Sequence, residues 1–164
     1  MSDQQPVFNI EKIYVKDASL EAPHAPQIFL EPAQPQLEVQ LATAATRAAD
    51  GLYESVVTIT VTAKAGDKTC FLVEVAQAGL FQIRNVPEAD LEPILGIACA
   101  NILFPYARES VADLITRAGF PPVHLAPMNF EAMYAARQQT QGPDARGPDT
   151  RGPDTAGPRI EVAH

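Results

Sequence analysis

The sequence predicts an α+β fold, with a four-stranded antiparallel sheet and helices packed on one of its faces. Two observations support this class. Four segments in the first half of the chain alternate apolar and polar residues, which is the period of a strand with one buried face. Beyond residue 86 the apolar residues recur every three or four positions, which is the helical period. Strands followed by helices are typical of helices gathered on one face of an antiparallel sheet.

The first expected strand covers residues 7–16. Its apolar residues alternate up to Ile10, after which the period slips by one residue before Ile13. One extra residue in a strand is typical of a β-bulge, which we expect near Glu11 and Lys12.

A proline-rich connection follows the first strand. Residues 21–35 contain four prolines, which cannot donate to a strand ladder and which bias the preceding residues toward extended backbone. We therefore expect a long crossover and not a tight hairpin. It leads to a second strand over residues 36–42, in which Leu37, Val39 and Leu41 share one face.

Residues 53–77 predict a β-hairpin with its turn at Gly66 and Asp67. The apolar residues of each strand fall on one face: Tyr53, Val57, Ile59, Val61 and Ala63 on the first, and Phe71, Val73 and Val75 on the second. The opposite phase of the second strand points Leu72 and Glu74 outward.

Two helical segments complete the predicted fold. The first begins at Pro87, and its apolar residues keep helical spacing until Gly119. We expect Pro93 and Pro105 to kink or divide it, because proline removes a helical hydrogen bond. A short final helix is expected over residues 129–138, where the first residue is a good N-cap.

The chain divides into an expected folded domain, residues 1–140, and a tail, residues 141–164. The tail repeats a Gly-Pro-Asp unit and has few apolar side chains, so we expect it to be disordered. The net charge of the chain is 12 − 20 = −8, and the tail contributes 3 − 4 = −1, so the folded domain is acidic. This charge argues against nucleic acid as a partner, because phosphates are also anionic.

No catalytic or metal-ligating pattern emerges from the sequence. The three histidines are scattered, and no serine-nucleophile, zinc-protease or paired CxxC spacing is present. Residues 66–69 lack the glycines and the following helix of a phosphate-binding loop, so a hairpin turn is the better interpretation. Cys70 and Cys99 are far apart in sequence and predict buried, reduced thiols. We expect no cofactor and no metal.

The hydropathy pattern argues against membrane insertion. No apolar run approaches the roughly 18 residues that a spanning helix needs. The first residues lack the basic and apolar regions of a secretory signal. We therefore expect a cytoplasmic protein with no direct membrane insertion.

Two sets of residues could bind partners. Leu72 and Glu74, together with Asp17 and Glu21 beyond the first strand, could form a docking surface or an ordinary solvated face. The second set could line an adaptable apolar groove or belong to the core: Leu37, Val39, Leu41, Phe130, Met133 and Tyr134. The residues alone leave both alternatives open.

Several segments resemble the SecB family of bacterial protein-export chaperones, and the resemblance covers roughly residues 7–138. The matching segments are Phe8 and Ile10 with KIYVKD (12–17), Ser19, EAPHAP (21–26), Glu74-Val75 followed by Gln77-x-Gly79-x-Phe81-x-Ile83, CANILFPYARE (99–109) and GFPPVHLAPMNF (119–130). The NILFPYARE run is the most specific of them.

The resemblance implies an ATP-independent chaperone that assembles as a homotetramer, a dimer of dimers. Such proteins keep precursor proteins unfolded and deliver them to the SecA motor, whose basic, zinc-bearing segment docks on an acidic sheet face. Any zinc would belong to SecA. By position, that face corresponds to Asp17, Glu21, Leu72 and Glu74, and client grooves correspond to Leu37, Val39, Leu41, Phe130, Met133 and Tyr134.

The chain also departs from the family pattern. Ala33 replaces a tryptophan that many relatives carry in the crossover, and Ala100 replaces a usual proline. The Gly-Pro-Asp tail has no recognisable counterpart. Two alternatives to the export chaperone are a SecB-like holdase for a dedicated client outside export, such as a toxin, and a small α+β ligand carrier.

Overall fold

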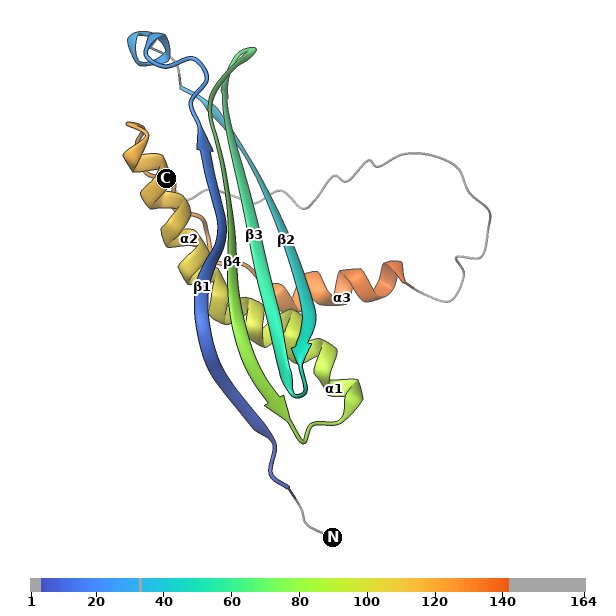
Figure 1. Cartoon of the computed structure of the whole chain (residues 1–164). Coiled ribbons are helices and arrows are strands. Elements are labelled where there is room, and N and C mark those ends of the chain that lie inside the picture. The colour runs from blue at the N-terminus through green and yellow to red at the C-terminus, as the bar shows by residue number, and fades with distance from the viewer. Residues whose placement is uncertain (1–3, 33, 142–164) are drawn as a thin grey trace, which may run out of the picture.

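A four-stranded antiparallel sheet with helices on one face forms the chain, which confirms the predicted fold class (Figure 1). The computed structural model describes residues 4–32 and 34–141. Ala33 and all of the predicted tail except Gln141 therefore lie outside the described residues. The strands are β1 (Val7–Glu21), β2 (Gln36–Ala49), β3 (Leu52–Ala65) and β4 (Lys68–Arg84). Their order in the sheet is β1-β4-β3-β2, so β1 and β2 are the edge strands.

The edge strand β1 contains two register shifts against β4. The first, between Ile10 and Lys12, confirms the bulge that the sequence predicts. The second, between Val15 and Asp17, was not predicted. Next to it, the buried Gln77 side chain donates from Nε2 to the backbone oxygen of Tyr14 at 3.0 Å. This hydrogen bond ties the irregular part of β1 to β4.

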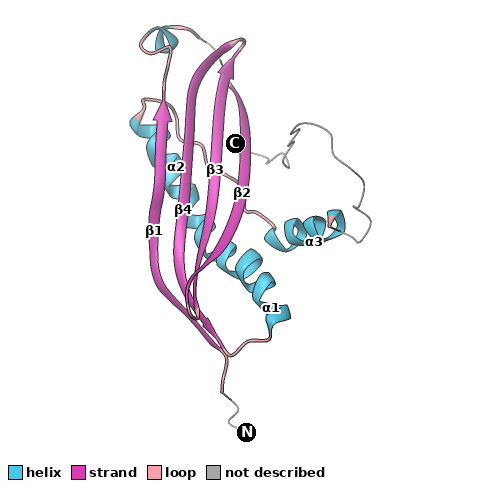
Figure 2. Cartoon of the chain, turned by 45° about the vertical axis from the view of Figure 1, so that its right-hand side comes forward, coloured by secondary structure: helices cyan, strands magenta, loops and turns pink. Residues whose placement is uncertain are grey.

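The core lies between the central strands and α2 (Ala100–Arg117). The residues predicted on the inner face of the hairpin are buried, except Tyr53, which is half-buried. They pack with the inward side of α2, including Leu103, Val111 and Ile115. Figure 2 shows α2 crossing this face of the sheet while the opposite face carries no helix. One face of the sheet therefore remains open within the described part of the chain.

The helical layer begins with α1 (Glu88–Pro93) and a π-helical turn (Ile94–Cys99) and continues directly into α2. The predicted division occurs at Pro93, where α1 gives way to the π-helical turn. Pro105 does not divide α2. Because Pro105 and Asn101 are both exposed, water can bind the Asn101 carbonyl that the proline leaves without its helical donor. Ala100 is the first residue of α2, and the helix runs on through it.

Two shorter helices complete the structure. A 3-10 helix, Gln27–Leu30, lies within the predicted crossover. The final helix, α3 (Phe130–Thr140), begins as predicted after Asn129, whose side-chain oxygen accepts a hydrogen bond from the Ala132 backbone N–H at 2.9 Å. In Figure 1, α3 extends beside β2 and away from the sheet.

Gly79 lies on β4 where the sheet packs against α2. A Cβ atom at this position would lie 2.6 Å from Cε2 of Phe81 and 3.0 Å from Cδ2 of Leu103. Both of these side chains are fully buried. A glycine is therefore required here because the Phe81 ring occupies the space that a side chain would need.

The cysteines behave as small apolar residues. Cys70 and Cys99 are free and buried, as predicted. Burial raises the pKa of the Cys99 thiol to about 12, so it stays protonated at neutral pH. Across residues 4–32 and 34–141, no helix is long and apolar enough to cross a membrane.

Candidate docking face and apolar surfaces

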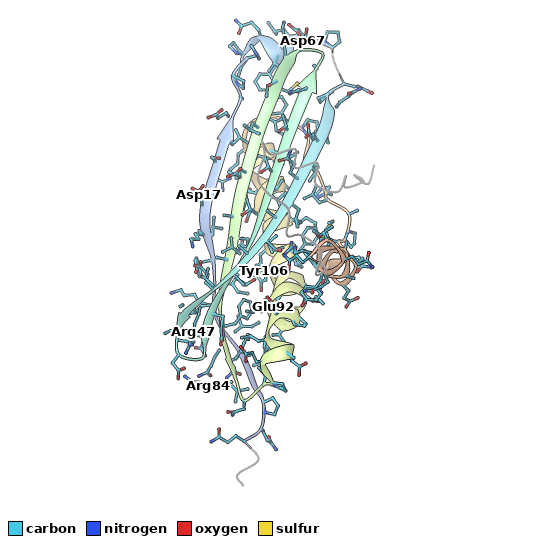
Figure 3. All side chains as sticks on the ribbon, turned by 90° about the vertical axis from the view of Figure 1, so that its right-hand side faces the viewer. Asp17, Arg47, Asp67, Arg84, Glu92 and Tyr106 are labelled. Atoms are coloured by element: carbon cyan, nitrogen blue, oxygen red, sulfur yellow. The ribbon has the colours of Figure 1, made fainter. Side chains whose placement is uncertain are left out.

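The four residues predicted for partner docking lie together on the helix-free face of β1 and β4. Cross-strand pairing places Glu21 opposite Leu72 and Asp17 opposite Ala76, while Glu74 lies two residues from Leu72 on the same side of β4. Leu72 is 37% exposed, and the three carboxylates are exposed as well. In Figure 3, Asp17 lies on the side of the sheet away from α3. We call Asp17, Glu21, Leu72 and Glu74 the acidic face.

The acidic face keeps its negative charge available. Glu74 accepts a hydrogen bond from Oγ1 of Thr60 at 3.0 Å, and none of the three carboxylates forms an ion pair within the described part of the chain. The nearby Lys16 is paired with Glu54 at 2.6 Å. Because that lysine is already neutralised, the acidic face can attract a basic partner.

A polar cluster that the sequence did not predict borders this face. Glu54 on β3 accepts hydrogen bonds from the Tyr14 hydroxyl and from Lys16 Nζ, both on β1. The cluster therefore spans the intervening strand β4. Both hydrogen bonds lower the pKa of Glu54, and the one from Lys16 has the larger effect. The hydrogen bond to Glu54 raises the pKa of Tyr14 to about 12, and partial burial adds to this shift.

We expect Glu54→Gln to lower the free energy of unfolding by about 1 kcal/mol at pH 7, a modest value because Lys16 is half-exposed. The pKa of Glu54 is lower in the folded than in the unfolded chain, so its contribution is present above the unfolded value of about 4.3. It disappears as the pH falls through the folded value. Urea unfolding of both proteins between pH 7 and pH 3 measures the difference.

The exposed carboxylate of Glu11, on the same strand, supplies the control. Glu11→Gln should change the free energy of unfolding little at any pH in this range. A Glu54→Gln deficit that stays constant down to pH 3 would show that the carboxylate charge is not what stabilises the cluster.

The structure divides the predicted client-binding residues by burial. Val39 and Phe130 belong to the core, with only 7% and 2% of their surface exposed. The remaining four are half-buried: Leu37, Leu41, Met133 and Tyr134. Phe130 packs edge-on against Phe104, with ring centroids 5.8 Å apart. In this conformation, four of the six side chains offer part of their surface to a client.

A groove of about 340 Å³ lies between β2, the π-helical turn and α3. Among the residues that line it, Tyr134 packs against Gly96, where a Cβ atom would lie 3.1 Å from the tyrosine ring. Arg137 also lines the groove and donates a hydrogen bond from Nη2 to Thr43 Oγ1 at 3.1 Å. Of the predicted client residues, Tyr134 lines this groove, and Phe130 lines a separate hollow of about 270 Å³ beside Asn101. The sequence predicted a groove at Tyr134 but not the other residues that line it, because these depend on where α3 packs.

The inward face of β1 is also apolar and exposed. Phe8, Ile10 and Val15 are 41%, 48% and 50% exposed and lie opposite buried residues of β4. They extend the apolar side of the sheet beyond its helical cover. We call Phe8, Ile10 and Val15 the apolar edge. Alternation predicts that these residues share a face with the core, but it does not reveal that β1 is an edge strand.

Comparisons with known proteins show which family the chain resembles. The family model described as preprotein translocase subunit SecB matches residues 1–141. A protein-export protein SecB of Methylobacillus flagellatus is 61% identical over 139 residues, covering 85% of this chain and 88% of that relative. The protein-export protein SecB of Chromobacterium violaceum is 62% identical over 144 residues, covering 86% of this chain and 96% of that relative.

A solved structure shares the fold. It is a SecB-like chaperone of Mycobacterium tuberculosis in complex with a peptide from an antitoxin, with a TM-score of 0.63 and 17% identity. The match covers 74% of this chain and 91% of that one. Given the family model and relatives that are over 60% identical across most of their length, the present chain belongs to the SecB family.

Proposed function

We propose that this chain holds precursor proteins unfolded without using ATP and delivers them to the export motor SecA through the acidic face. Its membership of the SecB family supports a chaperone role in protein export. The main support for the delivery step is the position of four residues: Asp17, Glu21, Leu72 and Glu74. These residues come from two distant segments of the chain, yet they gather on one open face with their carboxylates unpaired in the described residues.

Client binding is proposed at the apolar surface near β2 and α3. Leu37, Leu41, Met133 and Tyr134 supply partly exposed side chains. The buried Val39 and Phe130 belong to the core against which Leu37, Leu41 and Met133 pack. An unfolded segment can bury apolar side chains there at about 25 cal/mol per Å², before the cost of ordering is subtracted. A folded client has already buried those side chains. Selectivity for unfolded proteins therefore needs no sequence code.

The active assembly is proposed to be a homotetramer, a dimer of dimers, in the cytoplasm. The apolar edge supports association, because three large apolar side chains on an edge strand remain exposed in the single chain. A second copy would cover them. Several client surfaces on one assembly would also increase the overall affinity for a long unfolded chain.

Charge reversal tests the delivery step. We expect Glu74→Lys to weaken SecA binding by about ten-fold or more, because attraction becomes repulsion at an exposed position. Binding should be measured by isothermal calorimetry at low and high salt, since screening weakens the wild-type interaction. Light scattering should show that the variant still takes up a precursor diluted from denaturant and still ignores the native precursor.

Glu88→Lys provides a matched control, because it makes the same charge reversal in α1, on the helical side of the sheet. It should leave SecA binding nearly unchanged. Unaltered SecA binding by Glu74→Lys would refute docking at the acidic face. Failure of the wild-type protein to take up unfolded precursor would instead favour the ligand carrier, whereas uptake without SecA binding would favour a holdase outside export.

A further inference from the structure

The described part of the chain ends at the groove between β2 and α3. One side of this groove is formed by residues of α3 and its C-cap that are three, four and seven positions apart and therefore share a helix face: Tyr134, Arg137, Gln138 and Gln141. Gln141 is also the last residue that the structure describes. The rest of the chain therefore continues from the groove itself.

The groove combines apolar side chains, two charges and a free strand edge. Leu95 and Tyr134 line it and are half-buried. Glu92 and Arg137 line it as well, and neither forms an ion pair within the part of the chain that the structure describes. The strand β2 pairs only with β3, so its outer backbone groups can bind another extended chain. The groove is therefore suited to a short extended segment that alternates apolar and charged residues.

The sequence after α3 contains one segment of this kind. Its large apolar residues are Ile160 and Val162, which alternate with Arg159 and Glu161. In an extended backbone, the two β-branched side chains would point to one side and the two charges to the other. The segment thus carries one charge of each sign, as the groove does.

The connection between α3 and this segment is long enough for a return to the groove. It consists of the 17 residues 142–158, which contain no large apolar side chain. A chain of this length spans at most about 60 Å when fully extended. As a flexible coil its mean end-to-end distance is about 23 Å. Because the connection starts at the groove, it holds the segment there at an effective concentration in the range of about 1 mM, so even weak binding is sufficient for occupancy.

We propose that residues 159–163 bind in the groove of their own chain as an extended segment. Ile160 and Val162 pack against Tyr134, and Glu161 pairs with Arg137. The segment therefore takes the place of a client. Its effect on clients rests on the proposed client surface, to which Tyr134 also belongs: an unfolded precursor must displace the segment before it binds there, so weakly apolar chains are excluded.

NMR of the full chain with labelled leucine methyl groups tests the occupancy of the groove. Ile160→Asp combined with Val162→Asp removes both apolar contacts and should shift the methyl signals of Leu95, which lines the groove. The methyl signals of Leu72, on the open face of the sheet, should stay unchanged. Unaltered Leu95 signals would overturn the inference.

Two alanines in the connection provide a matched control. Ala145→Asp combined with Ala156→Asp adds the same two charges within residues 142–158. This variant should keep the wild-type signals of Leu95. If it shifts those signals equally, added charge and not the loss of an apolar contact is the cause, and the inference fails. Wild-type Leu95 signals that depend on protein concentration would instead assign the groove to a second copy of the chain.

A charge exchange tests the orientation of the segment. Arg137→Glu should shift the Leu95 signals, because it replaces attraction to Glu161 with repulsion. Adding Glu161→Arg should restore most of the wild-type signal positions. No restoration would refute the proposed ion pair, since the second change lies outside the groove unless the segment binds there.

Precursor binding separates this inference from the proposed function. The chain with Ile160→Asp and Val162→Asp should bind a fluorescently labelled precursor, diluted from denaturant, about three-fold more tightly than the wild type, because no segment has to be displaced. Shifted Leu95 signals without tighter binding would place the segment in the groove and refute client binding there. Unaltered Leu95 signals in a protein that takes up precursor would refute the inference and leave the chaperone function standing.

Discussion

Ile10→Asp should convert the proposed tetramer to smaller species. In the single chain Ile10 is 48% exposed on the apolar edge, and assembly would bury the remaining surface. Replacement with aspartate loses apolar burial and places an unpaired charge in the contact, at a combined cost of about 3 kcal/mol per copy. A two-fold contact contains the change twice, so the dissociation constant should rise by about four orders of magnitude. Light scattering across a range of protein concentrations measures the native mass.

Asn9→Asp is a close control because it introduces the same side chain at the adjacent position on the other face of β1. Asn9 is exposed and donates a hydrogen bond to Gln82 at 3.2 Å, so its loss should change stability only slightly. This variant should keep the wild-type mass. Circular dichroism would show whether Ile10→Asp keeps its strands and helices. A folded Ile10→Asp protein that retains four chains would exclude the apolar edge from the assembly contact.

Gly79→Ala should lower the free energy of unfolding by about 2–3 kcal/mol, and Gly79→Val should lower it further. The new Cβ atom would lie 2.6 Å from the Phe81 ring, and this ring is fully buried between β4 and α2. The ring or the helix must therefore move, which disrupts a close-packed core. Urea unfolding followed by circular dichroism measures the loss, with all variants compared at one protein concentration because the proposed assembly would add to stability.

Ala76→Val controls for added volume on the same strand. Ala76 lies three positions away on the open face, where it is half-buried and extra methyl groups do not meet the helix. It should change the free energy of unfolding by less than about 0.5 kcal/mol. A Gly79→Ala protein as stable as this control would mean that the Phe81 ring reorients freely within the core.

The fold class and most elements could be predicted because each strand has one buried face and each helix one buried side. Those local patterns also fixed the outward phase of Leu72 and Glu74. The phase of Asp17 could not be predicted in the same way. Continuing the alternation from Ile13 and Val15 would turn Asp17 toward the helices, but the second bulge turns it to the open face. Its position beside β4 is known only once the strands are paired.

Local sequence patterns could not predict the contacts between distant segments. The Tyr14–Glu54 hydrogen bond joins residues 40 positions apart across an intervening strand. The groove beside Tyr134 likewise depends on how α3 meets β2. The burial of Val39 and Phe130 reflects the same packing, because alternation and helical spacing mark apolar residues without distinguishing core from groove.

Each of the two bulges in β1 shifts the alternation of side chains between the two faces by one residue, and the second shift reverses the first. Even-numbered residues such as Ile10 face the core before the first bulge, odd-numbered residues such as Val15 between the bulges, and even-numbered residues such as Leu20 after the second. If a relative lacked one bulge but kept the same number of residues, every side chain of the strand beyond that point would turn to the opposite face of the sheet. Changes of length in this strand are therefore tolerated only where they create or remove a bulge, so β1 should diverge by substitution far more readily than by insertion.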